Sequence, residues 1–272
     1  MTFLGKTKIT DFDALLDECN QYISIDKDRA KSSVMNQIHS ITKNTEIDPS
    51  NEVVRLEKSW YSSLEASEPN YSVYSDPYYV CDIWTCWSIY SSKSIKSIMN
   101  PKSLIDKSVV DYLGSCKKVL DLGCGFGFTT ACLKEMYPDA EVVGTNLKDS
   151  WQYKVSENIA KKQDFVLTED SSHIKDVDLI FASEYFEHIE NSLEHLHEVI
   201  ENNNPRMLVV ANGYNGKAIG HFNKYIYKDK EFTAKETSLN FGKSMRSLGY
   251  KKLKTKIWND RPSIWVREER LL

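Results

Sequence analysis

The chain has 272 residues, 41% of them hydrophobic, and a formal net charge of −4 at pH 7. A chain of this length and composition can bury one large core plus an additional segment, so we expect one principal domain rather than two. No stretch approaches 18 uncharged apolar residues, which excludes a membrane-spanning helix. The start, MTFLGKTKITDFD, lacks the apolar run of a secretion signal, so we expect a cytoplasmic protein.

The six cysteines are scattered along the chain without C-x-x-C pairs. This distribution indicates reduced, mostly buried thiols rather than a disulfide framework or a structural zinc site. Cys81 and Cys86 form the only close pair, and no second pair completes their spacing. We therefore expect both to pack in the core.

Positive charge is concentrated towards the C-terminus. From Lys217 to Leu272 there are 14 Lys and Arg against 6 Asp and Glu. An anionic partner such as nucleic acid would favour this segment, but basic residues on the solvated faces of terminal elements give the same pattern. The overall charge of −4 opposes the nucleic-acid interpretation.

The first 110 residues predict peripheral helices and contain no recognisable motif. Apolar residues recur at helical spacing in TDFDALLDECNQYI, across residues 30–41 and in VVRLEKSWYSSLEA. The segment that follows, NYSVYSDPYYVCDIWTCW, is dense in Tyr and Trp. These aromatic side chains would either pack a helical cap onto the core or form a wall on which a substrate stacks.

The most informative stretch runs from Lys117 to Leu147 and reads KKVLDLGCGFGFTTACLKEMYPDAEVVGTNL. A short apolar run leads into Gly123, Gly125 and Gly127, and a helix-compatible segment follows. This order predicts a strand, a tight turn and a helix. Glycine permits positive φ and lets backbone N–H groups approach a ligand closely, so we predict a nucleotide-like cofactor at this turn.

An acid, Asp121, precedes the first glycine, and the glycine spacing differs from the dinucleotide fingerprint G-x-G-x-x-G. A carboxylate there would repel a pyrophosphate and would suit a cationic amine or a hydroxyl donor. The stretch resembles motif I of the class I S-adenosylmethionine-dependent methyltransferases, V-L-D-x-G-C-G-x-G. The resemblance implies S-adenosylmethionine as cofactor, with contacts from Asp121, Leu122, Gly123, Cys124, Gly125 and Gly127.

Strands are next expected over residues 141–147 and 164–169, with a helix over 149–161 between them. In the family an acid at the end of the second strand binds both ribose hydroxyls of the cofactor. Here Asn146 stands at that position, before Leu147, which we also expect at the cofactor. An amide accepts from only one hydroxyl, so ribose binding should survive but weaken, and an aspartate there should bind more tightly. By position alone, the resemblance places Asp170 and Ser171 at the adenine.

A continuous apolar run, residues 177–182, predicts a fourth strand buried on both faces. Because ligands bind beyond the carboxyl ends of such strands, the residues that follow should lie at the mouth of the site: Ser183, Glu184, Glu187 and His188. Their sequence resembles the S-E-x-x-E-H motif of many small-molecule methyltransferases, such as ubiquinone-biosynthesis-type O-methyltransferases, and of Hen1-type RNA 3′-terminal 2′-O-methyltransferases.

In the Hen1-type enzymes the two glutamates and the histidine hold a divalent metal together with a second histidine after strand five. His221, which follows the predicted fifth strand 206–211, is the candidate here, although no H-x-x-H or H-D-H cluster surrounds it. The resemblance thus implies Mg²⁺ or Mn²⁺ bound by Glu184, Glu187, His188 and His221. In the alternative, Glu187 and His188 cap and pack without a metal. His188, Glu184 or His221 would then deprotonate a hydroxyl directly.

The C-terminal part predicts helices over 191–202 and 232–248 and then a hairpin of strands 252–258 and 263–267. We therefore expect an α/β, Rossmann-like class I methyltransferase fold. Its sheet would have seven strands in the order 3-2-1-4-5-7-6, mostly parallel with an antiparallel last strand. A helical N-terminal cap, residues 1–110, would precede the S-adenosylmethionine-binding domain, residues 111–272.

The expected function is methyl transfer from S-adenosylmethionine to an oxygen or nitrogen nucleophile of a small molecule. Two alternatives stay open. One is an RNA or DNA methyltransferase, for example one that performs metal-assisted ribose 2′-O-methylation. The other is a non-catalytic cofactor-binding module, for which Asn146 is the one indication.

Overall fold

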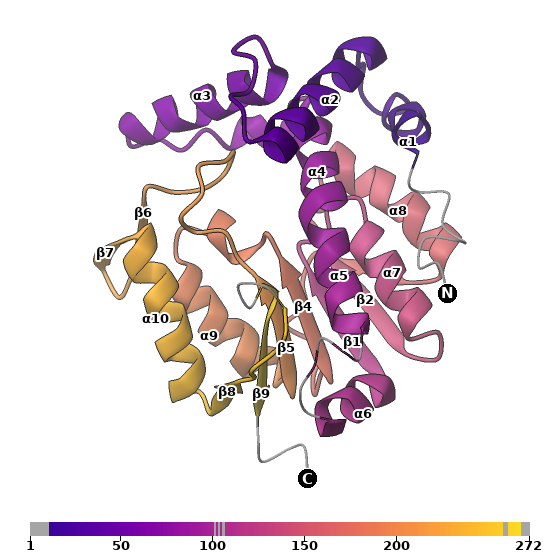
Figure 1. Ribbon diagram of the computed structural model, residues 1–272, viewed down its shortest axis with the longest axis vertical. Helices are drawn as coiled ribbons and strands as arrows, with labels where there is room; N and C mark the ends of the chain where they lie inside the picture. The colour runs from indigo at the N-terminus through magenta and orange to yellow at the C-terminus, as the bar shows by residue number, and fades with distance from the viewer. Residues whose placement is uncertain (1–10, 101, 103, 105–106, 258–260, 268–272) are drawn as a thin grey trace.

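The computed structural model describes all residues except 1–10, 101, 103, 105–106, 258–260 and 268–272. A seven-stranded sheet forms its centre, in the order β3-β2-β1-β4-β5-β9-β8 (Figure 1). The parallel strands are β1 (Lys118–Leu122), β2 (Glu141–Thr145), β3 (Val166–Thr168), β4 (Leu179–Ser183) and β5 (Met207–Ala211). The antiparallel strands are β9 (Ser263–Arg267), which pairs with β5, and β8 (Tyr250–Lys252), which pairs with β9. The predicted strand order is confirmed.

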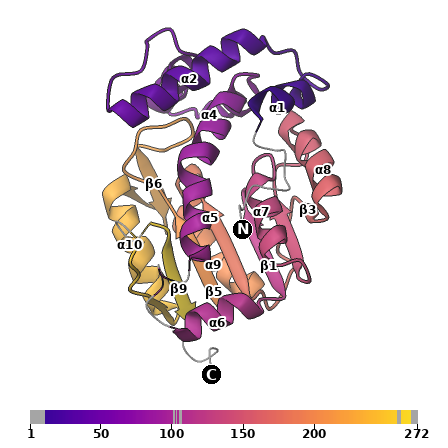
Figure 2. The same ribbon diagram turned by 45° about the vertical axis from the view of Figure 1, so that its right-hand side comes forward.

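Helices cover both faces of the sheet (Figures 1 and 2). On one side lie α7 (Phe128–Met136) and α8 (Trp151–Gln163), and on the other lie α9 (Ser192–Asn203) and α10 (Ala234–Ser247). A further helix, α6 (Lys107–Ser115), leads into β1. The central strands are buried on both faces, because β4 and β5 are almost continuously apolar and are covered by helices.

The N-terminal helices form a cap at one end of the sheet (Figures 1 and 2). The cap contains α1 (Phe12–Cys19), α2 (Lys27–Lys43), α3 (Glu52–Glu65), the 3₁₀ turn η2 (Tyr71–Ser75) and α4 (Tyr79–Cys86). From α4 the chain continues through a π-helical turn, η3 (Trp87–Ser91), into α5 (Ser92–Met99), which packs on α7. Buried side chains of cap and sheet belong to one cluster, in which the Trp84 ring lies 5.7 Å from that of Phe128.

The structure departs from the sequence-based expectations in the C-terminal part. Strand β8 ends at Lys252, whereas the predicted strand began there, and part of the predicted hairpin turn lies outside the described residues. A separate hairpin of β6 (Lys224–Tyr227) and β7 (Lys230–Thr233) was not predicted. Because β7 ends at Thr233, α10 begins at Ala234 rather than at the predicted residue 232, and Thr233 and Glu236 form a capping box at its start.

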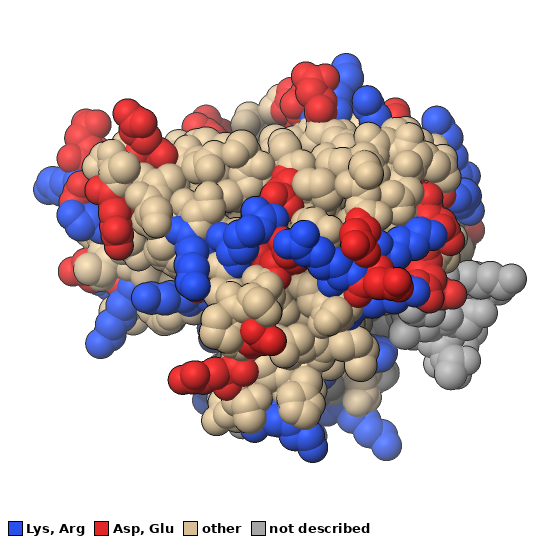
Figure 3. Space-filling view, turned by 90° about the horizontal axis from the view of Figure 1, so that it is seen from above, with Lys and Arg blue, Asp and Glu red and all other residues tan. Residues whose placement is uncertain are grey.

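The six cysteines are free and mostly buried, as predicted. None of the described helices is long and apolar enough to cross a membrane. On the face viewed from the cap end, Lys and Arg side chains are interspersed with Asp and Glu (Figure 3). That face therefore presents no continuous surface of one charge.

Candidate active site

The glycine-rich turn after β1 has the predicted backbone conformation. Gly123, Gly125 and Gly127 have φ values of 66°, 55° and 87°, in the left-handed region that favours glycine. A Cβ atom on Gly123 would overlap the ring of Tyr185, and one on Gly127 would lie 2.8 Å from Cζ of Phe165. Two of the three glycines are therefore required for packing as well as for backbone conformation.

A cavity of about 630 Å³ lies between this turn, the carboxyl ends of the strands and the cap. Several predicted cofactor contacts line it: Gly123, Cys124, Gly125, Asn146, Leu147, Ser183 and Glu184. Predicted candidates His188 and His221 line it too. The structure thus brings together residues at or after the carboxyl ends of the first, second, fourth and fifth parallel strands, as expected.

Other predicted cofactor contacts do not line the cavity: Asp121, Leu122, Gly127, Asp170 and Ser171. The Asp121 carboxylate accepts a hydrogen bond of 2.6 Å from the Thr130 hydroxyl and so anchors the strand to α7. Burial raises the pKa of Asp121 to about 7, although the Thr130 bond opposes the shift. Its role in cofactor binding stays a prediction.

Neither of the residues expected at the adenine, Asp170 and Ser171, lines the cavity. Asp170 is turned to its own loop, where it accepts hydrogen bonds from the Ser172 backbone N–H (2.7 Å) and hydroxyl (2.8 Å). Glu169 lines the cavity instead, because β3 ends at Thr168 and Glu169 is the first residue beyond it. Glu169 was not predicted at the site because the predicted strand, 164–169, included it.

Asn146 ties the end of β2 to the glycine-rich turn. Its Nδ2 donates a 2.7 Å hydrogen bond to the Gly125 carbonyl and lies 3.3 Å from the Ser156 hydroxyl, while its Oδ1 accepts from the Leu147 N–H. A carboxylate cannot make the first of these bonds, because it has no proton to donate when ionised. The Gly125 carbonyl therefore favours an amide over a carboxylate at position 146.

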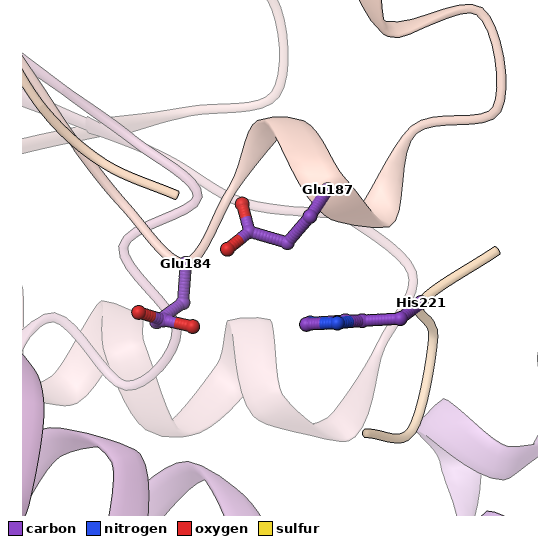
Figure 4. Close-up of side chains that lie close together, drawn as sticks. All are labelled: Glu184, Glu187 and His221. Atoms are coloured by element: carbon purple, nitrogen blue, oxygen red, sulfur yellow. The ribbon is translucent and has the colours of Figure 1, made fainter. Parts of the chain in front are cut away.

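A second cluster lies beyond β4 and β5. Glu184 follows β4 directly, Glu187 lies in the 3₁₀ turn η5 (Phe186–His188), and His221 lies in the loop after β5. One possible ligand atom from each side chain lies within 4.8 Å of the others. Figure 4 shows the His221 ring extending towards the two carboxylates. Three of the four predicted metal ligands thus converge.

The two carboxylates of this cluster differ in their partners. Glu187 Oε1 accepts from the Gly213 N–H, while Glu187 Oε2 is buried and has no hydrogen-bond partner among the described residues. Glu184 Oε1 accepts a 2.7 Å bond from Arg261. Burial, and then the charge of Glu184, raises the pKa of Glu187 to about 8. Burial also raises the pKa of Glu184, against the attraction of Arg261. A cation between them would favour the doubly ionised pair.

The tautomer of His221 follows from its hydrogen bond. Nδ1 lies 2.7 Å from the Gly216 carbonyl oxygen, and because a carbonyl only accepts, Nδ1 must carry the proton. Burial lowers the pKa of His221, so the ring is neutral and the lone pair of Nε2 is available to a ligand. The backbone carbonyl of His221 is held by Trp60 Nε1 from the cap, at 2.7 Å. Two carboxylates and one such imidazole fit Mg²⁺ or Mn²⁺.

His188, the fourth predicted ligand, lies outside this group of three. Its Nδ1 is 3.4 Å from the Tyr74 hydroxyl of the cap, and its ring packs edge-on against that of His221 with centroids 4.8 Å apart. Burial, and then His221, lowers the pKa of His188 to about 3. The ring is therefore neutral and only weakly basic near pH 7.

Residues of the cap, a segment without a recognisable motif, also line the cavity. Tyr74, Tyr79 and Trp87 line the cavity, and Tyr79, Trp84 and Trp87 are buried in the core, so the packing role is confirmed and the substrate-stacking role stays a prediction. Asp82 of α4 also lines it, and burial, with the charges of Glu184 and Glu57, raises the pKa of Asp82 to about 7. Only the tertiary position of α4 reveals this carboxylate.

Residues 120–202 match a family model described as a methyltransferase domain. A search of curated proteins finds no match.

Solved structures similar to the chain include the methyltransferase domain of bacterial CtHen1-C. It is 19% identical, the match covers 65% of this chain and 97% of that one, and the TM-score is 0.43. An S-adenosylmethionine-dependent methyltransferase from Aquifex aeolicus is 17% identical over 64% and 95% of the two chains, with a TM-score of 0.37. The O-methyltransferase of a trans-AT PKS multienzyme from Brevibacillus brevis is 18% identical over 43% of each chain, with a TM-score of 0.32.

The segment matched by the family model begins in β1 and ends in α9, and so includes the glycine-rich turn and the end of β4. The strand order of the sheet and the positive φ angles of the turn agree with that match. Residues 120–202 therefore match a methyltransferase domain, and the sheet that contains them has the strand order expected of the class I S-adenosylmethionine-dependent methyltransferase fold.

Proposed function

We propose that the enzyme transfers the methyl group to a hydroxyl oxygen of a small molecule, and that Glu184, Glu187 and His221 hold a divalent cation at the acceptor. The single observation that carries this proposal is the convergence of these three side chains at the edge of the cavity that the glycine-rich turn lines. We assign residues 111–272 to cofactor binding and residues 1–110 to enclosing the acceptor.

The cofactor would lie over the glycine-rich turn. Gly123, Cys124 and Gly125 offer backbone there, and Asn146 and Glu169 offer side chains at the ends of β2 and β3. Glu169 supplies the carboxylate that Asn146 lacks, so a hydroxyl or amino donor of the cofactor would find an acceptor. Ser183 shares a hydrogen bond of 3.0 Å with Ser91, which supports the wall between β4 and the cap.

The lining of the cavity favours a small acceptor over RNA or DNA. Its described lining residues include the acids Asp82, Glu169 and Glu184 but no Lys or Arg. A polynucleotide needs cationic groups along its backbone, and carboxylates would repel it. The cap contributes Tyr74, Tyr79 and other side chains to the lining, which limits the space for a polymer.

Methyl transfer needs the attacking oxygen aligned with the sulfonium, and holding both groups in one cavity supplies most of the acceleration. A divalent cation would lower the pKa of a coordinated hydroxyl. Glu184 and Glu187 would supply its negative ligands, and the Nδ1 bond to Gly216 would orient the His221 ring. His188, with a pKa of about 3, is poorly suited to remove the proton directly near pH 7.

The free cysteines fit a reducing compartment, which supports the cytoplasm as the location.

The proposal is tested by calorimetry with S-adenosylhomocysteine, followed by transfer of labelled methyl groups to separate metabolite, RNA and DNA pools. We expect micromolar or tighter cofactor binding and label in the metabolite pool. Label in RNA or DNA alone would support the nucleic-acid alternative, for which the basic C-terminal segment is the one favourable feature. Cofactor binding without label in any pool would support a non-catalytic module.

A further inference from the structure

A second cavity, of about 350 Å³, lies between α10 and the β5 and β9 strands. We refer to it as the basic groove, and its residues include Asn212, Arg246, Lys252, Arg261, Ser263 and Trp265. We propose that the basic groove binds a phosphoryl group of the methyl acceptor, so that the substrate is a phosphorylated small molecule. This inference rests on the proposed function and names the class of its substrate.

The charges of the two cavities are opposite. Arg246, Lys252 and Arg261 line the basic groove, and no Asp or Glu stands among its described lining residues. Arg261 is partly neutralised by its ion pair with Glu184. Arg246 remains in the lining even when that pair is discounted, and its guanidinium would attract a phosphoryl group.

The Arg246 side chain is oriented by contacts with Trp265 and Gly242. Its guanidinium lies 5.7 Å from the centre of the Trp265 ring, and its Nη1 donates a 3.1 Å bond to the Gly242 carbonyl one turn earlier in α10. Among the described residues, no carboxylate pairs with it at salt-bridge distance. The remaining N–H groups of the planar guanidinium can donate hydrogen bonds to the oxygens of a phosphoryl group.

The basic groove also contains a buried acceptor that lacks a partner. Oδ1 of Asn212, one residue beyond β5, is inaccessible to solvent and has no hydrogen-bond partner among the described residues. Leaving such an atom unpaired is unfavourable, because it loses its hydrogen bonds to water without replacement. If the Asn212 side chain turned towards the groove, a hydroxyl beside the phosphoryl group, or the proton of a monoanionic phosphate, would satisfy this oxygen. Cationic donors and one acceptor together indicate a ligand of that kind.

The basic groove and the carboxylate cluster meet at Arg261. Arg261 lines the groove, and its Nη2 lies 2.7 Å from Glu184 Oε1. Gly213 packs against this contact. A Cβ on Gly213 would lie 3.0 Å from Arg261 Nη2, and 3.3 Å from one carboxylate oxygen of Glu184 and one of Glu187. A phosphoryl group in the groove would therefore leave the rest of a small acceptor beside the cluster, where its hydroxyl would be methylated.

The first test is a calorimetric titration of the full chain with inorganic pyrophosphate, in the absence of divalent cations. Arg246→Gln should weaken binding at least tenfold. The matched control is Lys243→Gln, which removes a positive charge from an exposed position of the same helix outside the groove and should bind as the wild type does. Melting temperatures of both variants verify their folding. Equal binding by the two variants, or no binding by the wild type at millimolar pyrophosphate, would overturn the proposal.

The second test uses the acceptor itself. A metabolite extract is treated with phosphatase, with nuclease or with neither before incubation with enzyme and labelled S-adenosylmethionine. We expect the labelled product to be lost after phosphatase and retained after nuclease. A product that survives phosphatase, or one that nuclease abolishes, contradicts a phosphorylated small molecule. Absence of product from every extract counts against the proposed function, and the pyrophosphate titration then decides on the basic groove by itself.

Discussion

Replacing Glu187 by glutamine should change how stability depends on pH. The side chain is fully buried, and burial followed by the charge of Glu184 raises its pKa from 4.5 to about 8. A raised pKa means that the folded protein binds a proton more tightly than the unfolded chain does. The resulting stability is complete below pH 4.5 and is lost as the pH rises through 8. Glutamine has no charge to bury, so this loss should be absent from the variant.

The size of the effect follows from the shift. At 1.36 kcal/mol per pKa unit, a change from 4.5 to about 8 lowers the free energy of unfolding by roughly 3 to 5 kcal/mol between the acid and alkaline limits. Part of this change comes from the interaction of Glu187 with Glu184. For a chain of this size that is roughly 6 to 15 °C in melting temperature. Asp82 and Asp121, whose pKa values are each raised to about 7, add a loss in the same direction to every variant. The informative quantity is therefore the difference between variants.

The assay is a thermal melt in EDTA between pH 5 and pH 9, with Glu201→Gln as control because Glu201 is exposed on α9. The wild type and the control should lose stability with rising pH more steeply than Glu187→Gln. Adding millimolar Mg²⁺ or Mn²⁺ at pH 8 should raise the melting temperature of the wild type but not that of Glu187→Gln. Parallel pH profiles for all three proteins would refute the reasoning about this buried pair.

Three further substitutions test the cofactor and acceptor sides. Gly123→Ala should abolish binding of S-adenosylhomocysteine, because the φ of 66° at Gly123 and the Tyr185 ring leave no room for a Cβ. An unchanged dissociation constant by calorimetry would contradict the placement of the cofactor. Asn146→Asp should weaken that binding by roughly 1 kcal/mol through loss of the Gly125 bond, and tighter binding would show that ribose contacts dominate. His221→Ala should reduce turnover at least tenfold while leaving cofactor affinity within twofold, and a parallel loss of both would indicate a structural role.

The elements that surround the glycine-rich turn were predictable because strong local patterns encode them. The glycines at 123, 125 and 127 and the apolar strands that flank them require one backbone path, and the strand order follows from the alternation of strands and helices. The β6–β7 hairpin was missed because its sequences, KYIY and KEFT, are short, charged and largely exposed, so they show no buried face.

The candidate site was less predictable where it depends on tertiary contacts. Nothing local to Asp82 indicates that α4 will carry it into the cavity. The sequence cannot show that Asn146 donates to the Gly125 carbonyl, a bond that an aspartate would lose and that leads us to expect weaker rather than tighter cofactor binding. His188 was grouped with the metal ligands by motif, whereas the structure places its Nδ1 beside Tyr74. In each case the contact joins segments far apart in the chain.

The central claim is cation-assisted methylation of a hydroxyl, and its most direct measurement is labelled methyl transfer to the metabolite pool with and without excess EDTA. Glu184, Glu187 and His221 converge on one point, so we predict that transfer stops in EDTA and returns when Mg²⁺ or Mn²⁺ is added in excess. Full transfer in excess EDTA would contradict the claim.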